Sequence, residues 1–266
     1  MNGAGNDFVV VDNRELSLSL SGEEIAKLCQ RQKGIGADGL LAVEPAQNGA
    51  DYRMRYYNAD GGEAEMCGNG ARCFAHFVNR LNDNTLEKVS FETMAGVIHA
   101  DILDNSIRVN LGSPHDQQMN IPLTVDGEEL TVHSINTGVP HAVVIVDDLE
   151  KIDIRSLGSS IRHHDHFSPT GTNVNFMQVV GPDLIHIRTY ERGVEDETLA
   201  CGTGMVACSL IHHQLADSPL PLKIMVRGGD TLLVDFDQND AGQYENAMLT
   251  GPAEFTFEGT LFPAQS

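Results

Sequence analysis

Three short sequence patterns occur twice along this chain, in the same order and at a nearly constant spacing. The first copies lie at residues 3–12, 55–58 and 67–70, and the second copies lie 135, 133 and 134 positions later, at residues 138–147, 188–191 and 201–204. A chance similarity would not preserve both the order and the offset. The patterns therefore predict two similar halves of about 130 residues each, a usual size for a domain.

The same patterns indicate the fold class. Residues 3–12 end in a β-branched run typical of a strand, and the apolar stretch at 24–32 is typical of a helix. We therefore expect an α+β protein of two pseudo-symmetric α/β halves. Turn residues cluster at 111–114, which places the halves at residues 1–112 and 113–251. A single domain with coincidental internal similarity is the alternative.

Each half carries a cysteine directly before a predicted helix. Cys67 precedes Gly-Asn-Gly and an apolar run, and Cys201 precedes Gly-Thr-Gly and a second apolar run. The free N–H groups of a first helical turn bind anions, and glycine lets a ligand approach the backbone closely. The positive end of the helix lowers the pKa of a nearby thiol. We therefore expect a reactive thiol beside a carboxylate-binding site in each half.

Two thiols that face each other suit the inversion of a stereocentre. If the halves enclose a cleft, one of Cys67 and Cys201 removes an α-proton and the other donates a proton to the opposite face. The helix N-termini stabilise the charge that develops on the substrate carboxylate, so no cofactor and no metal is needed. An inert, buried cysteine is the more common case, which we expect for Cys29, Cys73 and Cys208. A redox pair is a further hypothesis for Cys67 and Cys201.

Composition excludes several kinds of partner. The formal charge of −21 comes from 38 acidic and 17 basic residues, and it would repel nucleic acids and anionic membranes. No apolar run approaches the ~20 residues of a membrane helix, and a signal-peptide pattern is missing from the N-terminus. Five cysteines do not form the paired framework of a small secreted domain. We expect a cytoplasmic protein with reduced thiols that binds neither nucleic acid nor membrane.

Two other motifs match known binding sites only in their letters. Residues 34–39 read Gly-Ile-Gly-Ala-Asp-Gly, like a dinucleotide-binding loop, but they follow a helix-like segment instead of a strand. His163, His164 and His166 could bind a metal only with ligands from elsewhere in the chain, and the pair at 212–213 is too undefined to supply them. We expect no dinucleotide at 34–39 and a solvated loop at 163–166.

With these motifs assembled, the chain resembles the diaminopimelate epimerases over nearly its whole length. The resemblance is carried by the sequences at 3–8, 58–61 and 191–193 together with both cysteine motifs. Members of this family interconvert LL- and meso-diaminopimelate on the route to lysine and peptidoglycan without pyridoxal phosphate. The resemblance implies halves in which a mixed sheet wraps around a central helix, with the active site in the cleft between them. It also implies a tail, 252–266, that packs on the first half, and a homodimer.

The resemblance further implies a set of site residues. Cys67 and Cys201 would be the acid–base pair, and His141 and Glu191 would orient or tune them. An Arg fork and a carboxylate suit the second carboxylate and ammonium of a small amino-acid substrate. The residues expected to bind this substrate are Asn6, Asn58, Gly68, Asn69, Asn173, Glu191, Arg192, Gly202 and Thr203. A buried structural histidine is the alternative for His141.

The chain departs from the common family pattern at several positions. Gly39 stands where many members carry Gln, and Val139 stands where many carry Asn, so we leave both out of the site. The chain opens later than usual, so we expect a first strand that is short or missing. The loop at 194–197 is longer than in some members, which would shift Glu191 and Arg192 relative to Cys201.

Two rival functions remain open at this point. A proline or hydroxyproline racemase-like enzyme also uses two cysteines, but its first motif usually reads Cys-Gly-His-Gly, and Asn69 occupies the place of that histidine. A non-catalytic amino-acid sensor could use the same two cysteines as an oxidation switch. Steady-state turnover distinguishes these hypotheses.

Overall fold

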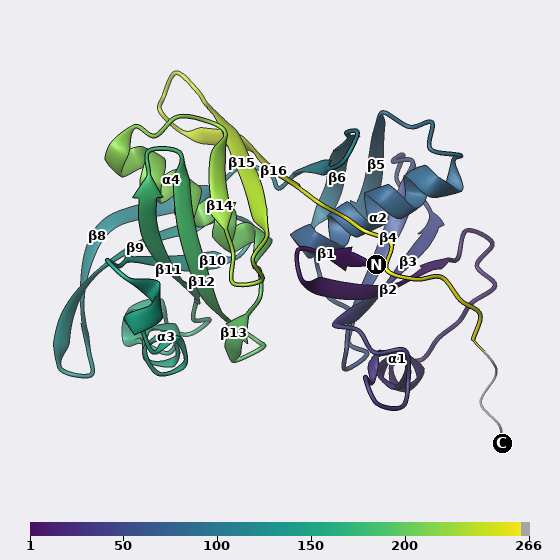
Figure 1. Cartoon of the computed structure of the whole chain (residues 1–266), viewed down its shortest axis with the longest axis horizontal. Coiled ribbons are helices and arrows are strands. Elements are labelled where there is room, and N and C mark those ends of the chain that lie inside the picture. The colour runs from purple at the N-terminus through teal and green to yellow at the C-terminus, as the bar shows by residue number, and fades with distance from the viewer. Residues whose placement is uncertain (262–266) are drawn as a thin grey trace.

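The structure is a computed structural model of the 266-residue chain and describes residues 1–261. Its elements lie in two groups that are seen side by side in Figure 1. The first group comprises β1 (Asn2–Gly3), β2 (Asn6–Asp12), α1 (Gly22–Cys29), β3 (Gly39–Pro45), β4 (Tyr52–Asn58), α2 (Gly68–Leu81), β5 (Lys88–Thr93), β6 (Gly96–Ile102) and β7 (Ile107–Asn110).

The second group begins with a long hairpin and then follows the order of the first group. Its elements are β8 (His115–Val125), β9 (Glu128–Asn136), β10 (Pro140–Ile145), η1 (Leu149–Lys151), α3 (Ile154–Arg162), η2 (Asp165–Phe167), β11 (Asn173–Gly181), β12 (Leu184–Glu191), β13 (Asp196–Thr198), α4 (Gly202–Ala216), β14 (Leu222–Met225), β15 (Thr231–Gln238) and β16 (Tyr244–Gly251). None of the helices within residues 1–261 has the length and hydropathy to span a membrane.

The two groups repeat one pattern of strand pairing. From β2 to β7, neighbouring strands pair parallel, antiparallel, parallel, antiparallel and antiparallel. From β10 through β11, β12, β14 and β15 to β16, the same sequence of directions recurs. The last strands of the two groups, β7 and β16, pair antiparallel and join both groups into one mixed sheet. The predicted fold class of two pseudo-symmetric α/β halves is therefore confirmed, whereas the domain boundaries at residues 112 and 251 stay a prediction.

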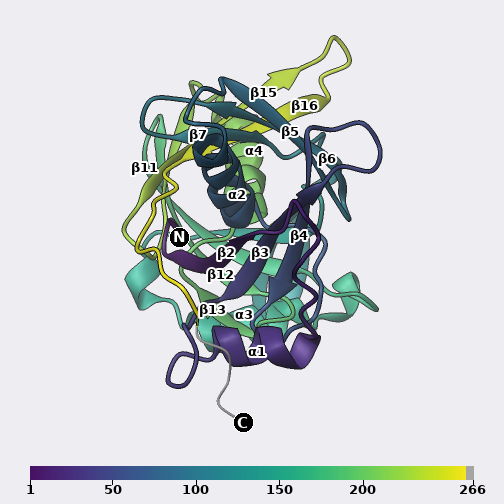
Figure 2. The same cartoon turned by 90° about the vertical axis from the view of Figure 1, so that its right-hand side faces the viewer.

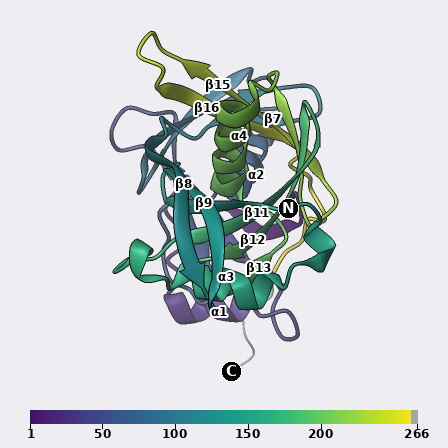
Figure 3. The ribbon, with the colours of Figure 1, turned by 90° about the vertical axis from the view of Figure 1, so that its left-hand side faces the viewer.

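A central helix occupies each half. Figure 2 shows α2 in front of α4, and Figure 3 shows α4 in front of α2. In α2, Phe74, Ala75 and Val78 are fully buried, and nearly every residue of α4 up to His212 is buried. A helix that is buried on nearly all sides is mostly apolar around its circumference, which explains the largely apolar run after Cys201. Both helices lie where the sequence predicts them.

The start of the chain and the segment after β16 lie together on the first half. Strand β1 has only two residues, so the first strand is short as predicted, and Asn2 forms a two-way backbone bridge with Glu254. Beyond β16 the chain returns across α2, where the Ala253 carbonyl lies 2.6 Å from Nδ1 of His76 and the Phe255 ring packs against Arg80. The last part of the predicted tail, residues 262–266, lies outside the described residues.

Candidate active site

The N-termini of the two central helices are in direct contact. Cys67 is the N-cap residue of α2, and Cys201 is the N-cap residue of α4. A Cβ atom placed on Gly202 would lie 3.4 Å from the Cα atom of Gly68, and one placed on Gly68 would lie 3.6 Å from the Cα atom of Gly202. A single added Cβ atom would already be in van der Waals contact with the opposite helix, so the two backbones lie close together. The fold thus brings both cysteine motifs to one place.

Both helix starts offer free backbone donors. The first helical hydrogen bonds run from the N–H of Ala71 to the carbonyl of Cys67, at 2.8 Å, and from the N–H of Met205 to the carbonyl of Cys201, at 3.0 Å. The preceding three N–H groups of each helix therefore have no partner within the helix. Such groups, at the positive end of a helix, form an anion-binding site.

Burial raises the pKa of both thiols, which corrects the lowered pKa expected from the motifs. Desolvation is the largest cause at Cys67 and at Cys201, where the residue is only 6% exposed, and the carboxylate of Glu191 raises both pKa values further. Backbone N–H groups of the first turn, including that of Gly70, act in the expected direction at Cys67. The motifs indicate the lowering of the pKa by these N–H groups, but the larger rise caused by desolvation depends on the tertiary structure.

The thiol of Cys67 lies among side-chain amides. Its Sγ donates to Oδ1 of Asn6 at 3.5 Å, and Nδ2 of Asn69 donates to the same oxygen at 3.4 Å. Asn69 also donates to the carbonyl of Ala200, the residue before Cys201, at 3.2 Å. The Asn69 amide therefore links the start of α2 to the segment that carries the second thiol.

The thiol of Cys201 lies at the end of a chain of hydrogen bonds. Thr203 Oγ1 is 3.6 Å from Sγ of Cys201 and 2.9 Å from Nε2 of His141. Asn175 Nδ2 donates to Nδ1 of His141 at 3.0 Å, and Thr189 Oγ1 donates to Oδ1 of Asn175 at 3.0 Å. Because Nδ1 accepts, the neutral ring donates from Nε2 to the Thr203 hydroxyl, which leaves that hydroxyl proton for the thiol. Burial lowers the pKa of His141 to about 3, so the ring is neutral at physiological pH.

The remaining charged residues of the predicted site surround the end of β12. Glu191 is the last residue of this strand; its Oε2 accepts from the Thr198 hydroxyl at 2.9 Å, and burial raises its pKa. Asn173 Oδ1 accepts from the backbone N–H of Arg192 at 2.8 Å, and its Nδ2 donates to the carbonyl of Pro140. Both ends of the Asn173 side chain are thus bonded to backbone, and it fixes the turn that carries Arg192.

Three residues near the thiols lie outside the set that the sequence predicted. Asn175 is completely buried, and its signal in the sequence is a polar residue in an otherwise apolar strand. Arg72 is also completely buried, and it donates to Oδ1 of Asn69 and the carbonyls of Gly68 and Pro252 without forming an ion pair within residues 1–261. Tyr56 is the third, and nothing in its local sequence distinguishes it from Tyr57.

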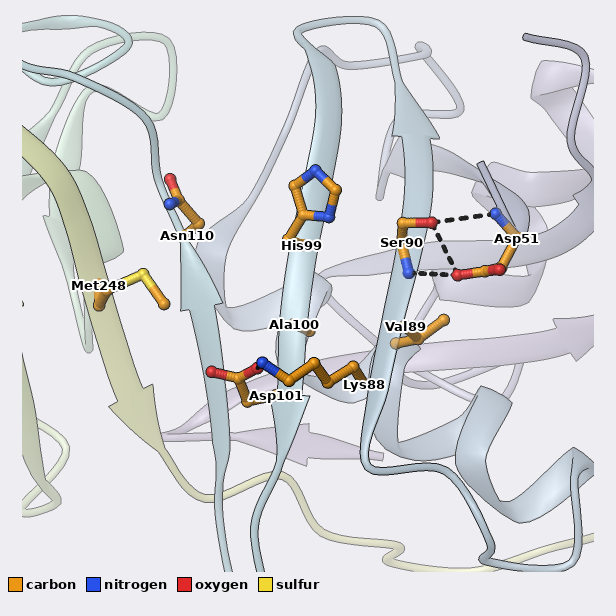
Figure 4. Close-up of a pocket in the computed structure, with 9 residues that line it drawn as sticks. All are labelled: Asp51, Lys88, Val89, Ser90, His99, Ala100, Asp101, Asn110 and Met248. Atoms are coloured by element: carbon orange, nitrogen blue, oxygen red, sulfur yellow. Dashed lines mark hydrogen bonds and ion pairs between the residues drawn. The ribbon is translucent and has the colours of Figure 1, made fainter. Parts of the chain in front are cut away.

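Two surface hollows lie away from the thiols. The larger has a volume of about 440 Å³ and is formed by β5, β6, β7 and β16 (Figure 4). Its polar side chains pair with each other, because Ser90 donates to Asp51 and Lys88 forms an ion pair with Asp101. The second hollow, of about 390 Å³, is lined by residues 12–17. Neither hollow contains a predicted site residue.

The structure also places the two motifs that matched binding sites by their letters. Residues 34–38 lie between α1 and β3, and residue 39 begins β3, so the segment follows a helix and leads into a strand, as predicted. His163 is exposed and His164 is half-buried beside the short helix η2, where His164 Nδ1 accepts from the backbone N–H of His166. In the described part of the chain, no group of three or more His, Cys, Asp or Glu side chains is placed to hold a metal ion.

Comparison with known proteins gives agreement in sequence and in fold. A family model described as diaminopimelate epimerase matches residues 1–116 and 133–256. The diaminopimelate epimerase of Aquifex aeolicus (strain VF5) is 43% identical over 272 residues, which cover 98% of this chain and 96% of that protein.

Solved structures with the same fold are much more distant in sequence. A phenazine biosynthesis protein of the PhzF family from Enterococcus faecalis aligns with a TM-score of 0.71 at 14% identity, over 98% of this chain and 94% of that one. A probable proline racemase from Agrobacterium radiobacter K84 aligns with a TM-score of 0.66 at 16% identity, over 90% of this chain and 80% of that one. At such identities the likeness shows the fold alone.

Proposed function

The chain belongs to the diaminopimelate epimerase family, and we propose that it inverts an α-carbon of diaminopimelate by passing a proton between Cys67 and Cys201. It is an isomerase of lysine biosynthesis. The observation that carries the two-thiol assignment is the contact between Gly68 and Gly202, because this contact brings two N-cap cysteines from distant parts of the chain to one place.

In the proposed reaction the α-carbon loses one proton and gains one proton. The thiolate of one cysteine takes the α-proton, and the electron pair of the broken C–H bond spreads from the α-carbon into the carboxylate. The thiol of the other cysteine returns a proton to the opposite face. The two sulfurs end with exchanged protonation states, and no atom is oxidised or reduced.

The two helix starts supply the electrostatic part of this reaction. The free N–H groups of Gly68 and Asn69 in α2, and of Gly202 and Thr203 in α4, suit the carboxylate at the reacting carbon. Charge that develops on this carboxylate during deprotonation meets donors that are already in position, which is the arrangement that lowers the barrier most effectively. This assignment needs groups of the protein alone.

The polar residues around the two thiols suit the second amino-acid group of the substrate. In this proposal the guanidinium of Arg192 and the amides of Asn6, Asn58 and Asn173 bind or position the distal carboxylate. Glu191 faces the ammonium groups and, through its charge, holds the pKa of both thiols high. His141 acts on Cys201 through Thr203.

The proposal also includes a homodimer and a cytoplasmic location. A homodimer is supported by the resemblance to a family that often forms one, and sedimentation velocity showing only monomer would contradict it. A cytoplasmic location is supported by the chemistry, because the reaction needs reduced thiols and all five cysteines are free.

Proton exchange followed by NMR tests the proposed function. Reduced protein is incubated with LL-diaminopimelate in D₂O, with proline in parallel, and Cys67→Ala and Cys201→Ala are compared with the thiol-removal control Cys29→Ala. We expect deuterium at the α-carbon and the meso isomer with wild type and with the control. We expect a loss of about 10²–10⁴-fold in either site variant. Exchange on proline alone would favour a proline racemase-like enzyme, and no turnover on either substrate would favour a thiol sensor.

A further inference from the structure

The space beside Gly39 is filled by the ring of Tyr56. Gly39 begins β3 and lies opposite Asn58, the last residue of β4. A Cβ atom on Gly39 would lie 2.9 Å from Cε2 of Tyr56 and 2.5 Å from the carbonyl oxygen of Tyr57, both closer than real Cβ contacts. Glycine at this position therefore leaves room for both the Tyr57 carbonyl and the Tyr56 ring, which together give a physical reason for the departure of Gly39 from the common family pattern.

The ring of Tyr56 lies next to the start of α2. It packs edge-on against Phe8, with ring centroids 6.0 Å apart, and Phe8 in turn lies 3.5 Å from the position of a Cβ on Gly70. Burial raises the pKa of the phenol, and the nearby Cys67 and Glu191 raise it further. Tyr56 is thus close to ionisable groups of the site from both halves, and its hydroxyl stays protonated as a hydrogen-bond donor.

The hydroxyl of Tyr56 fixes the orientation of Asn58. It donates to Oδ1 of Asn58 at 2.8 Å. With Oδ1 occupied as an acceptor, the amide presents Nδ2 as its free end, and the residue is exposed to solvent. A side-chain N–H donor in this place suits a carboxylate oxygen of a ligand.

The neighbouring Tyr57 serves a different part of the molecule. Successive side chains of a strand point to opposite faces of the sheet. Tyr57 packs on the cluster that contains Ile25 and Leu40, and the guanidinium of Arg55 lies 5.4 Å from its ring centroid. Tyr57 therefore provides a matched control of the same residue type in the same strand.

We propose that Tyr56 is a positioning residue that sets the specificity for the non-reacting end of the substrate. Its ring occupies the space beside Gly39, and its hydroxyl holds the amide of Asn58 so that Nδ2 donates to the second carboxylate of diaminopimelate. The inference rests on the proposed function. Because the second carboxylate is bound equally before and during proton transfer, this contact acts on KM and not on kcat.

Steady-state kinetics on LL-diaminopimelate test the inference. Tyr56→Phe removes only the hydroxyl, and we expect KM to rise roughly tenfold, the value of one hydrogen bond, with kcat within about twofold of wild type. Tyr57→Phe should leave both constants unchanged. Melting temperatures near the wild-type value will show that both variants are folded.

A double-mutant cycle tests the route through Asn58. Asn58→Ala should raise KM by itself, and adding Tyr56→Phe in that background should change KM by less than about twofold, because the hydroxyl no longer has an amide to orient. An unchanged KM in Tyr56→Phe, a fall in its kcat at constant KM, or multiplicative effects of the two substitutions would overturn the inference. Absence of turnover by the wild-type protein would instead refute the proposed function on which it rests.

Discussion

The chain of hydrogen bonds behind Cys201 can be broken by one added methyl group. Gly204 lies in the first turn of α4, and a Cβ atom on it would overlap Oδ1 of the buried Asn175. The overlap forces this amide to move in Gly204→Ala. Any movement weakens the bonds at both of its ends, because Oδ1 accepts from Thr189 and Nδ2 donates to His141 and to the carbonyl of Ala142.

The magnitude follows from these contacts. Three buried hydrogen bonds are at risk, and each contributes about 1 kcal/mol to the free energy of unfolding. Replacing glycine by alanine within a helix returns roughly 1 kcal/mol. We therefore expect Gly204→Ala to lower the free energy of unfolding by about 2 kcal/mol. Because His141 loses the donor that fixes its ring, we also expect kcat to fall by about tenfold.

The pseudo-symmetric position in the other half provides the control. A Cβ atom on Gly70 would lie 3.3 Å from Cδ2 of Leu41 and 3.5 Å from the Cβ of Cys67, so it meets the end of a flexible side chain and no buried polar group. Gly70→Ala should therefore change the free energy of unfolding by less than about 1 kcal/mol. Urea denaturation of both variants measures the difference. Equal midpoints for the two variants would refute the reasoning.

Three further predictions concern charge. The pKa of His141 is about 3 in the folded state and near 6.5 in the unfolded state, so the free energy of unfolding should fall as pH drops from 6.5 towards 3, by up to about 1.4 kcal/mol per pH unit. His141→Gln should remove this part of the fall. Urea titrations at several pH values measure it. Glu191→Gln removes a charge that raises the pKa of both thiols, so the thiol-dependent limb of the pH profile of kcat/KM should move to lower pH; an unmoved limb contradicts this. Arg72→Met removes a charge that lowers the pKa of Cys67, so alkylation of Cys67 at fixed pH should slow in a Cys201→Ala background.

The fold could be predicted from the sequence to the extent that it depends on local patterns and on their repetition. The apolar runs after Cys67 and Cys201 predicted α2 and α4, and the constant offset predicted that the second half would repeat the first. The contact of Gly68 with Gly202 could not be derived in this way. It depends on the pairing of β7 with β16, two strands far apart in the chain whose pairing leaves no periodic signal in either sequence.

The direction of the thiol pKa shifts was wrong for a related reason. A helix start is a local feature, and its N–H groups do favour the thiolate of Cys67. Desolvation depends on what the rest of the chain packs over the sulfur. The charge of Glu191 lies at the end of β12, in the half that carries Cys201 and opposite the half that carries Cys67. Motif spacing gives neither quantity, so a motif can indicate which cysteine is reactive but not how far its proton affinity is shifted.

The two halves share one fold but differ in the side chains that lie behind the two thiols. Leu41 pairs with Tyr56 in the first half, and Asn175 pairs with Thr189 at the corresponding register of the second half. The Thr189–Asn175 pair begins the polar chain that reaches Cys201 through His141, whereas an apolar leucine interrupts any such chain behind Cys67.

This asymmetry has a chemical reason in the proposed reaction. The two faces of the reacting α-carbon are equivalent only in the step that exchanges a proton, while the second amino-acid group of diaminopimelate must extend to one side. A symmetric lining would bind that group equally in two directions and place the α-carbon wrongly in one of them. In this proposal, divergence at Leu41 and Tyr56 lets the first half act together with Arg192 and Asn173 of the second half in recognising the distal group. The polar pair Asn175 and Thr189 leaves the second half to fix His141 behind the thiol of Cys201.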